Sequence, residues 1–214
     1  MRIKVCGMTQ LDQVKALDQL GVDFAGFIFY PQSPRYIGKF MDPNLLRKFR
    51  GDRINKVGVF VNESPDQVKR AIEDCGLYLV QLHGDETPKY CEKMADFIGV
   101  IKAFRVQPGD DILWKIKDYQ DIVDFFLFDT AGAGYGGTGK KFDWSALQDL
   151  NIGKPFFLSG GIGPTDAPSV IDFSRQKASK DLFALDLNSK FETAPGIKNM
   201  DTLVPFLHQL SPQP

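Results

Sequence analysis

Two residues with reactive side chains directly follow short strand-like runs of this sequence, one of alternating apolar residues and one apolar throughout. Cys6 comes after Arg2-Ile-Lys-Val5, and Asp129 comes after Phe125-Phe-Leu-Phe128. A carboxyl group at the end of a buried strand is partly desolvated, which strengthens its hold on a proton. A thiol in such a position is either inert packing or a reactive group, and the residue types alone leave both interpretations open. Asp129 could likewise cap or brace a loop instead.

Glycines and hydrogen-bond donors follow two later apolar runs. Ser159-Gly160-Gly161-Ile-Gly163 comes after one run, and Asp186-Leu-Asn188-Ser189 comes after the next. The backbone N–H groups of a glycine run before a helix N-terminus suit a phosphate group, and Asn188 and Ser189 would add donors. Asp186 is anionic, so we expect it to orient backbone or sugar groups. We favour phosphate binding over a simple turn with a helix cap.

Two further side chains lie where strands are expected to end. Arg35 stands in a long polar loop, and its rigid bidentate donor group suits a carboxylate, although a solvated loop charge is the plainer interpretation. His83 follows the run Leu77–Leu82. It either lines the site or is a satisfied histidine that holds Asp85, and we favour the second.

The segment after Asp129 is rich in glycine, which suits a loop that closes over a ligand. Gly134–Gly139 fits the dinucleotide pattern G-x-G-x-x-G, and Gly134–Lys141 comes within one residue of the P-loop pattern. Neither motif follows its strand directly, and Lys141 stands where Mg²⁺ needs Ser or Thr. No Asp or Glu lies about 20 residues beyond the first glycine to bind a ribose. Both nucleotide interpretations are therefore disfavoured.

Strand-like runs and amphipathic helices alternate eight times along the chain. Strands are expected over residues 2–5, 24–29, 56–61, 77–82, 97–104, 125–128, 155–158 and 182–185. Helices are expected over residues 11–20, 44–50, 65–75, up to 95, 112–119, 143–150, 164–173 and 197–210, with Thr9 as the first N-cap. This alternation predicts a single-domain α/β fold, a (β/α)₈ TIM barrel over residues 1–210 with a loose tail at 211–214. A doubly wound sheet, the alternative, needs only five or six strands.

The composition excludes several classes of protein. Among 214 residues, 26 Lys and Arg nearly balance 27 Asp and Glu, so we expect no nucleic-acid partner. No apolar stretch approaches the about 20 residues that span a bilayer, and the N-terminus lacks a signal-peptide pattern. We therefore expect no membrane partner and a cytoplasmic location. Cys6, Cys75 and Cys91 are scattered, which argues against disulfides or a zinc site.

Six short motifs stand in order along the chain. They are Lys4-Val-Cys6-Gly-Met-Thr9, Ser33-Pro-Arg35-Tyr-Ile37, Gln81-Leu-His83-Gly-Asp85, Phe128-Asp129-Thr130, Gly137-Thr-Gly139 with Phe142-Asp-Trp144, and Ser159-Gly-Gly-Ile-Gly163. Together they resemble the phosphoribosylanthranilate isomerases, barrel enzymes of tryptophan biosynthesis, over residues 4–199. One departure is Asp186-Leu-Asn-Ser-Lys190-Phe-Glu192, where the family often has Asp-Val-Ser-Ser-Gly-Val-Glu. Asn188 keeps a donor there, and Lys190 replaces a glycine.

The resemblance implies an Amadori rearrangement of N-(5-phosphoribosyl)anthranilate to 1-(2-carboxyphenylamino)-1-deoxyribulose 5-phosphate, without a cofactor. An acid must protonate the furanose ring oxygen, and a base must remove the proton from sugar C2. By resemblance Asp129 is the acid and Cys6 the base, and Arg35 would hold the anthranilate carboxylate. Tyr30 and Phe104 either flank the aromatic ring of this phosphosugar substrate or simply fill space. We expect a monomer or a homodimer.

Two other functions remain open at the level of the sequence. One is another phosphosugar barrel enzyme, such as an epimerase or a decarboxylase. A zinc- or magnesium-dependent epimerase needs His and carboxylate ligands at several strand ends, and only His83 is placed there. The other is a nucleotide-binding module that uses the glycine loop, and a binding assay with Mg²⁺ would distinguish it.

Overall fold

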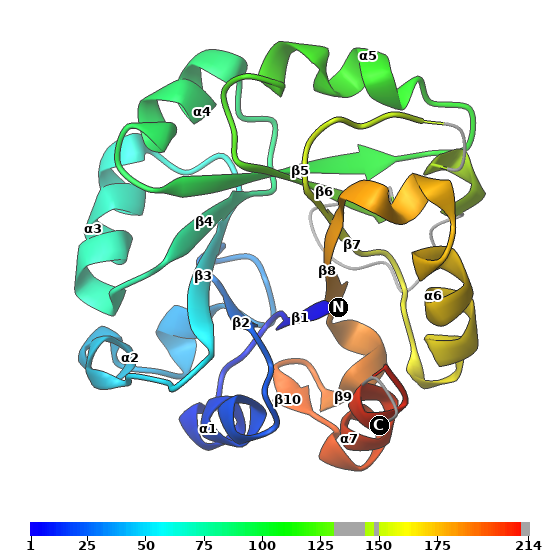
Figure 1. Ribbon diagram of the computed structural model, residues 1–214. Helices are drawn as coiled ribbons and strands as arrows, with labels where there is room; N and C mark the ends of the chain where they lie inside the picture. The colour runs from blue at the N-terminus through cyan, green and yellow to red at the C-terminus, as the bar shows by residue number, and fades with distance from the viewer. Residues whose placement is uncertain (131–143, 148–149, 211–214) are drawn as a thin grey trace.

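The computed structural model describes residues 1–130, 144–147 and 150–210 of the chain. Eight parallel strands close into a barrel in the order β1 to β8, and β8 pairs with β1 to complete the ring. The helices lie around the outside of the strands (Figure 1). The predicted (β/α)₈ barrel is therefore confirmed.

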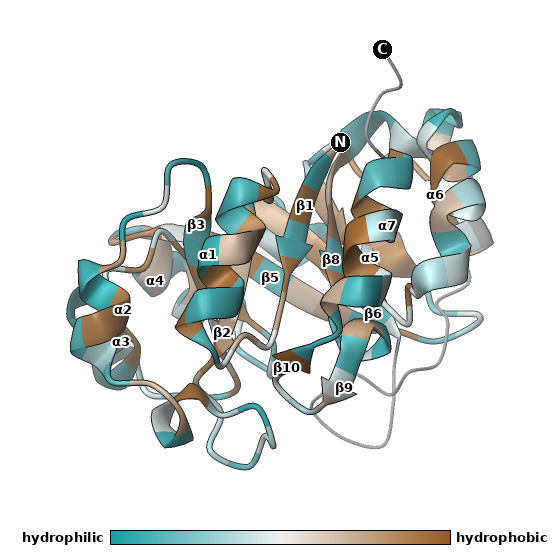
Figure 2. Cartoon of the chain, turned by 90° about the horizontal axis from the view of Figure 1, so that it is seen from below, coloured by the Kyte–Doolittle hydropathy of each residue, from teal (hydrophilic) through white to brown (hydrophobic). Residues whose placement is uncertain are grey.

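The barrel strands are short, and all lie close to their predicted positions. They are β1 Arg2–Val5, β2 Phe24–Ile28, β3 Asn55–Phe60, β4 Leu79–Leu82, β5 Gly99–Val106, β6 Phe125–Thr130, β7 Phe156–Leu158 and β8 Leu182–Leu187. The helices are α1 Leu11–Gln19, α2 Pro43–Lys48, α3 Pro65–Cys75, α4 Pro88–Ala95, α5 Ile112–Ile116, α6 Ala167–Ser174 and α7 Met200–Leu210. Their hydrophobic and hydrophilic sides are visible in Figure 2.

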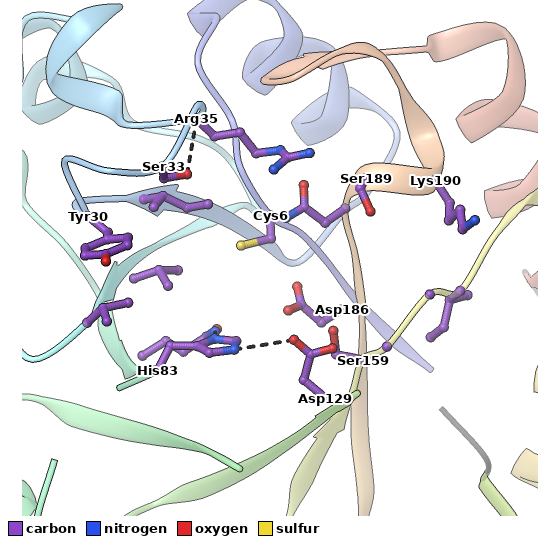
Figure 3. A pocket seen from close by; sticks show the side chains of 18 residues that line it. Cys6, Tyr30, Ser33, Arg35, His83, Asp129, Ser159, Asp186, Ser189 and Lys190 are labelled. Atoms are coloured by element: carbon purple, nitrogen blue, oxygen red, sulfur yellow. Dashed lines mark hydrogen bonds and ion pairs between the residues drawn. The ribbon is translucent and has the colours of Figure 1, made fainter. Parts of the chain in front are cut away.

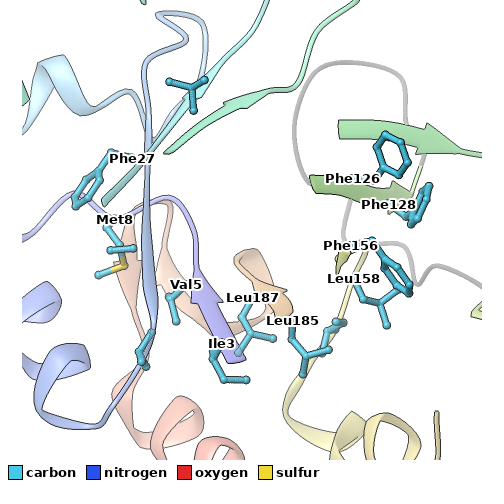
Figure 4. Packing of buried hydrophobic residues seen from close by; sticks show 14 of the residues in the cluster. Ile3, Val5, Met8, Phe27, Phe126, Phe128, Phe156, Leu158, Leu185 and Leu187 are labelled. Carbon is cyan, nitrogen blue, oxygen red and sulfur yellow. The ribbon is translucent and has the colours of Figure 1, made fainter. Parts of the chain in front are cut away.

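Two apolar layers hold the barrel together. The outer layer fills the space between strands and helices with residues such as Val5, Phe27 and Phe126 (Figure 4). The inner layer plugs the barrel with Phe24, Val57, Leu79, Ile101, Ala103, Leu127, Phe157 and Ala184. Successive side chains of a strand point to opposite faces, so the residue two positions after an inner-layer residue also points inward. Because of this alternation, the side chains of polar residues at the strand ends point towards the interior of the barrel.

Several helix ends follow local sequence signals, but the start of α1 does not. Ser64 Oγ accepts a hydrogen bond from Gln67 N at 3.3 Å at the start of α3, and Gly76 ends this helix with a left-handed φ of +62°. The predicted N-cap at Thr9 is wrong, because α1 begins after Gln10 without a side-chain cap. Thr9 Oγ1 instead donates to the carbonyl of Gly196 at 2.6 Å.

Some predicted helices differ in extent from those observed. The expected helix over residues 112–119 changes from α5 to a 3₁₀ turn at Lys117–Tyr119, and residues 197–199 precede α7 instead of opening it. A short antiparallel hairpin, β9 Glu192–Ala194 and β10 Ile197–Lys198, takes that place. Of the helix expected over residues 143–150, the described part holds a 3₁₀ turn at Trp144–Leu147. The glycine-rich loop with its nucleotide-like motifs, and the tail at 211–214, lie outside the described residues.

Candidate active site

A cavity opens at the carboxyl ends of the strands, and all of the predicted site residues line it. These are Cys6, Arg35, His83, Asp129, Gly160, Gly161, Asp186, Asn188 and Ser189. The cavity holds about 760 Å³ of space, open solvent included. Figure 3 shows Cys6, His83, Asp129 and Asp186 within it. The barrel thus unites residues that are far apart in sequence.

Cys6 directly follows β1 and lies almost fully buried at 4% exposure. A Cβ atom on Gly26 of the neighbouring strand would stand 2.7 Å from the Cys6 sulfur, so a glycine is required there. Burial raises the pKa of the Cys6 thiol, and the positive charges of Lys4 and Lys198 offset this rise only in part. The resting protein therefore holds Cys6 as the neutral thiol rather than as the partial thiolate that a base requires.

Asp129 lies at the end of β6, two residues after the inner-layer residue Leu127, and is 8% exposed. Its Oδ1 accepts a hydrogen bond from Thr130 N at 2.8 Å. Its Oδ2 lies 3.4 Å from Nε2 of His83, as the dashed line in Figure 3 marks. The carboxyl group is thus held at both oxygens in a site that excludes most water.

His83 lines the cavity. Of the two roles considered for it, the structure favours lining the site over holding Asp85. Its ring contacts Asp129 on one side and Gln81 on the other, where Nδ1 lies 2.6 Å from Gln81 Nε2. Asp85 instead pairs with Arg105 at 2.6 Å. Sequence reasoning placed His83 correctly at the strand end but favoured the wrong neighbour.

Lys4 is a fully buried cation in the barrel interior. Its Nζ donates to Asp186 Oδ1 and to Gln81 Oε1, both at 2.8 Å. Burial alone would lower the pKa of Lys4, but Asp186 and Cys6 outweigh it, so the pKa is raised and the ammonium form is retained. Asp186, expected to orient backbone or sugar groups, therefore has Lys4 as a charged partner.

Arg35 reaches the cavity already paired with Glu192 of the β9 strand. Arg35 Nε donates to the two carboxylate oxygens at 2.9 and 3.0 Å, and Nη2 donates to Oε2 at 2.6 Å. Lys198 contacts Glu192 Oε1 at 2.7 Å and Asn188 Oδ1 at 2.8 Å. Burial opposes the charge on Glu192, but Arg35 and Lys198 hold its pKa below the ordinary value. One ionic cluster thus connects Arg35 to the loop after β8.

The two glycines after β7 adopt a backbone that other residues rarely reach. Gly160 has a φ of +93° and Gly161 a φ of +70°. The 3₁₀ turn Pro164–Asp166 and then α6 follow them, as expected for a loop before a helix. Lys190 also lines the cavity and adds a cation beside the loop that we expect to bind phosphate.

The two aromatic residues considered for ring stacking have different positions. Tyr30 lines the cavity, and its hydroxyl donates to Gln32 at 2.8 Å. Phe104 lies in the outer core, where its ring meets those of Tyr119 and Phe126 at centroid distances of 5.3 and 5.5 Å. The space-filling interpretation is therefore correct for Phe104.

Sequence reasoning missed the side chains that hold the site residues in place, among them Lys4, Gln81, Glu192 and Lys198. A usable signal existed for two of them. Lys4 and Gln81 stand two positions before Cys6 and His83 in strand-like runs, so strand alternation places them on the same inward face. Glu192 and Lys198 lie on a hairpin that gives no comparable signal.

The described residues offer no cluster of metal ligands. In residues 1–130, 144–147 and 150–210, no group of three or more His, Cys, Asp or Glu side chains could hold a metal ion. Within the same part of the chain, no helix is long and apolar enough to span a membrane. Independence from metals stays a prediction.

A closed parallel barrel with a cavity of polar residues at the carboxyl ends of its strands defines the (β/α)₈-barrel class of enzymes. The chain belongs to the N-(5'-phosphoribosyl)anthranilate isomerase family, whose profile matches residues 3–209, and it is an isomerase of that family. The isomerase of Phocaeicola vulgatus is 40% identical over 211 residues, which cover 98% of each chain.

Two solved structures extend this comparison. Monomers generated from the dimeric phosphoribosylanthranilate isomerase of Thermotoga maritima match with a TM-score of 0.79 and 33% identity over 98% of both chains. A phosphoribosylanthranilate isomerase in complex with reduced 1-(o-carboxyphenylamino)-1-deoxyribulose 5-phosphate matches with the same TM-score, identity and coverage. The shared fold and family are thereby established.

Proposed function

We propose that this isomerase converts N-(5'-phosphoribosyl)anthranilate to 1-(2-carboxyphenylamino)-1-deoxyribulose 5-phosphate, with Asp129 as general acid and Cys6 as general base. The observation that carries the proposal is the placement of both side chains in one cavity at the carboxyl ends of the strands. Related isomerases of the same length and fold support the choice of substrate.

Asp129 donates the proton that opens the sugar ring. The proton moves from the carboxyl group to the furanose oxygen, the bond between that oxygen and C1 breaks, and an iminium ion forms between C1 and the anthranilate nitrogen. Asp129 is 8% exposed, so few water molecules compete with the sugar oxygen for this proton. The N–H of Thr130 then stabilises the carboxylate that results.

Cys6 removes the proton from C2 in the fraction of the enzyme whose thiol has first released its own proton to solvent. Its thiolate takes the C2 proton, and the electron pair of the C–H bond neutralises the iminium ion to give an enolamine. The tautomerisation that follows adds a proton to C1 and removes one from the oxygen on C2. If Cys6 supplies the first and Asp129 accepts the second, both groups return to their starting forms. Lys4 and Lys198 lower the cost of the thiolate.

The two ends of the substrate are held on different loops. Gly160, Gly161, Asn188 and Ser189 bind the phosphate through backbone and side-chain donors. Arg35 binds the anthranilate carboxylate with the N–H groups that Glu192 does not use, since a guanidinium has five. Tyr30 lies beside the aromatic ring.

A fluorescence assay that follows loss of phosphoribosylanthranilate tests this function. We expect the wild-type protein to be active and Asp129→Asn to lose about 10²–10⁴-fold in kcat, the usual contribution of a positioned acid. Cys6→Ala should also lose kcat, whereas Cys75→Ala and the exposed Asp172→Asn should not. An inactive, folded wild-type protein would reject the proposed reaction.

The remaining expectations about partners follow from the same proposal. The ligand is a small phosphosugar, and neither nucleic acid nor membrane is involved. A homodimer is favoured over a monomer by the dimeric relative from Thermotoga maritima. The cytoplasmic location stays a prediction from the sequence.

A further inference from the structure

A continuous series of side-chain contacts connects Asp186 to Asp129 inside the barrel. Lys4 Nζ lies 2.8 Å from Asp186 Oδ1 and 2.8 Å from Gln81 Oε1. Gln81 Nε2 lies 2.6 Å from His83 Nδ1, and His83 Nε2 lies 3.4 Å from Asp129 Oδ2. Lys4 and Gln81 are 0% and 1% exposed, so water does not compete for these contacts.

The chemistry of Lys4 determines the direction of every bond in this series. An ammonium group can only donate, so the Gln81 atom beside it must be the amide oxygen. The other end of the Gln81 amide is then the NH₂ group, which can only donate to His83 Nδ1. An imidazole nitrogen that accepts a hydrogen bond carries no proton. The single ring proton of a neutral His83 must therefore lie on Nε2.

We propose that Lys4 and Gln81 are positioning residues that hold His83 as the neutral Nε2–H tautomer and direct this N–H at Asp129. The inference rests on the proposed role of Asp129 as the acid. When Asp129 gives up its proton, the carboxylate that forms faces a donor already in place. A separation of 3.4 Å leaves room for this contact to shorten as the charge develops.

The other states of His83 would work against the reaction. With the proton on Nδ1, a bare Nε2 would face Asp129 and could take the proton that the sugar oxygen needs. A doubly protonated ring would turn an N–H towards the NH₂ group of Gln81, so two donors would oppose each other. Lys4 and Gln81 thus exclude both states by hydrogen bonding alone.

The backbone around His83 is fixed as well. His83 N donates to Phe60 O at 2.8 Å, which ties the end of β4 to β3. Lys102 Nζ donates to the carbonyl of Gly84 and to Glu86 Oε2, both at 2.8 Å. The ring is therefore held at its backbone as well as at Nδ1.

Long-range ¹H–¹⁵N NMR spectra test the tautomer directly. The chain has two histidines, and His208 is exposed on α7, so His208→Gln assigns the signals and wild-type His208 is the internal reference. At neutral pH we expect His83 to show a protonated Nε2 and a bare Nδ1. A wild-type spectrum with the proton on Nδ1, or on both nitrogens, would overturn the proposal.

The variant Gln81→Glu reverses the bond to His83, because a carboxylate accepts and does not donate. We expect its His83 to carry a proton on Nδ1 and its kcat to fall by about 10–100-fold, as is usual when an orienting partner is lost. KM should change little, because Gln81 orients His83 and does not bind the substrate. Gln67→Glu, the same change at an exposed position, should alter neither readout. An unchanged His83 spectrum with unchanged kcat in Gln81→Glu would contradict the positioning role.

A substitute variant and a readout that needs no substrate keep this test decisive. If Gln81→Glu does not fold, the wild-type spectrum still decides the tautomer, and Gln81→Met, which removes the donor without adding charge, becomes the kinetic variant. The NMR result needs no substrate, so it is separable from the reaction itself. An Nε2–H signal in a protein without isomerase activity would reject the proposed function alone. An active enzyme with an Nδ1–H signal would reject this inference alone.

Discussion

Cys6 lies in surroundings that favour its neutral form. Burial raises the pKa of its thiol, while Lys4 and Lys198 act in the opposite direction. A base must be ionised before it can take a proton, and the ionised fraction of a thiol increases with pH. The thiolate available to the reaction is therefore expected to increase as the pH rises from neutral, up to the raised pKa of Cys6.

Alkylation with iodoacetamide should report this behaviour. We expect the rate at Cys6 to increase from about pH 6 to about pH 9, because only the thiolate reacts. At any one pH, Lys4→Met should slow the alkylation of Cys6 relative to the wild type, since it removes a charge that lowers the pKa of Cys6. Burial raises the pKa values of Cys75 and Cys91 to about 11 and about 12. Both thiols are therefore internal controls that should stay unalkylated in the native protein over this pH range. Peptide mass spectrometry measures all three, and a pH-independent rate at Cys6 would contradict this account.

Arg35 is expected to act on binding rather than on chemistry. Arg35→Met should raise KM by an amount equivalent to about 1.5–3 kcal/mol, the value of one hydrogen bond to a charged group. Arg47→Met, at an exposed position on α2, should leave KM unchanged. Steady-state kinetics provide the comparison, and an unaltered KM in Arg35→Met would place the substrate carboxylate elsewhere.

The positions of the reactive residues were predictable, but their partners were not. A barrel places every strand-end residue at one mouth, so Cys6, Asp129 and Asp186 could be grouped from sequence alone. Which neighbour each side chain contacts depends on side-chain direction and distance. Arg35 pairs with Glu192, 157 positions later in the chain, and no local pattern encodes that contact.

At the scale of elements, β2 makes room for the reactive end of β1. A Cβ atom at Gly26 would come within 2.7 Å of the Cys6 sulfur and 3.0 Å of its Cα atom. Gly58 of the next strand faces the outer core instead, where a Cβ atom would meet Leu77 at 2.5 Å. Both glycines are required by packing, but only Gly26 touches the site.

These two glycines give a matched pair of variants. Gly26→Ala and Gly58→Ala should each lower the free energy of unfolding by about 1–3 kcal/mol, the usual cost of overpacking. Only Gly26→Ala should also reduce kcat, by up to about 100-fold, because a shift of about 1 Å in a reacting group can have that effect. Denaturant titration and kinetics on both variants test the difference. Equal kcat values would show that the position of Cys6 is not limited by β2.

The hairpin β9–β10 shows why some elements escape sequence analysis. Its strands have three and two residues, too few for an alternation pattern to be recognised. It is held by distant contacts, such as the hydrogen bond from Thr9 to Gly196. Strands and helices with clear periodicity or capping, such as α3, were predicted nearly to the residue.

At the scale of the whole molecule, the barrel separates stability from chemistry. Apolar side chains plug its interior, and on three strands the next inward residue towards the carboxyl end is polar, as Gln81, Asp129 and Asp186 follow Leu79, Leu127 and Ala184 by two positions. The reaction proposed here uses proton transfer by Asp129 and Cys6 at this polar end of the barrel. We expect dialysis against a strong chelator to leave kcat intact in the fluorescence assay. A loss of activity that a divalent ion restores would contradict this prediction.

The fate of the hydrogen on sugar C2 tests the central claim most directly, because only the base touches that atom. With substrate deuterated at C2, the wild-type enzyme should form product more slowly than with unlabelled substrate, because the C–D bond breaks more slowly than the C–H bond. Cys6→Ala should fail to remove the deuteron, while Cys75→Ala should match the wild type. Rapid-quench mass spectrometry would follow the label. Removal of the C2 deuteron by Cys6→Ala at the wild-type rate would contradict the assignment of Cys6 as the base.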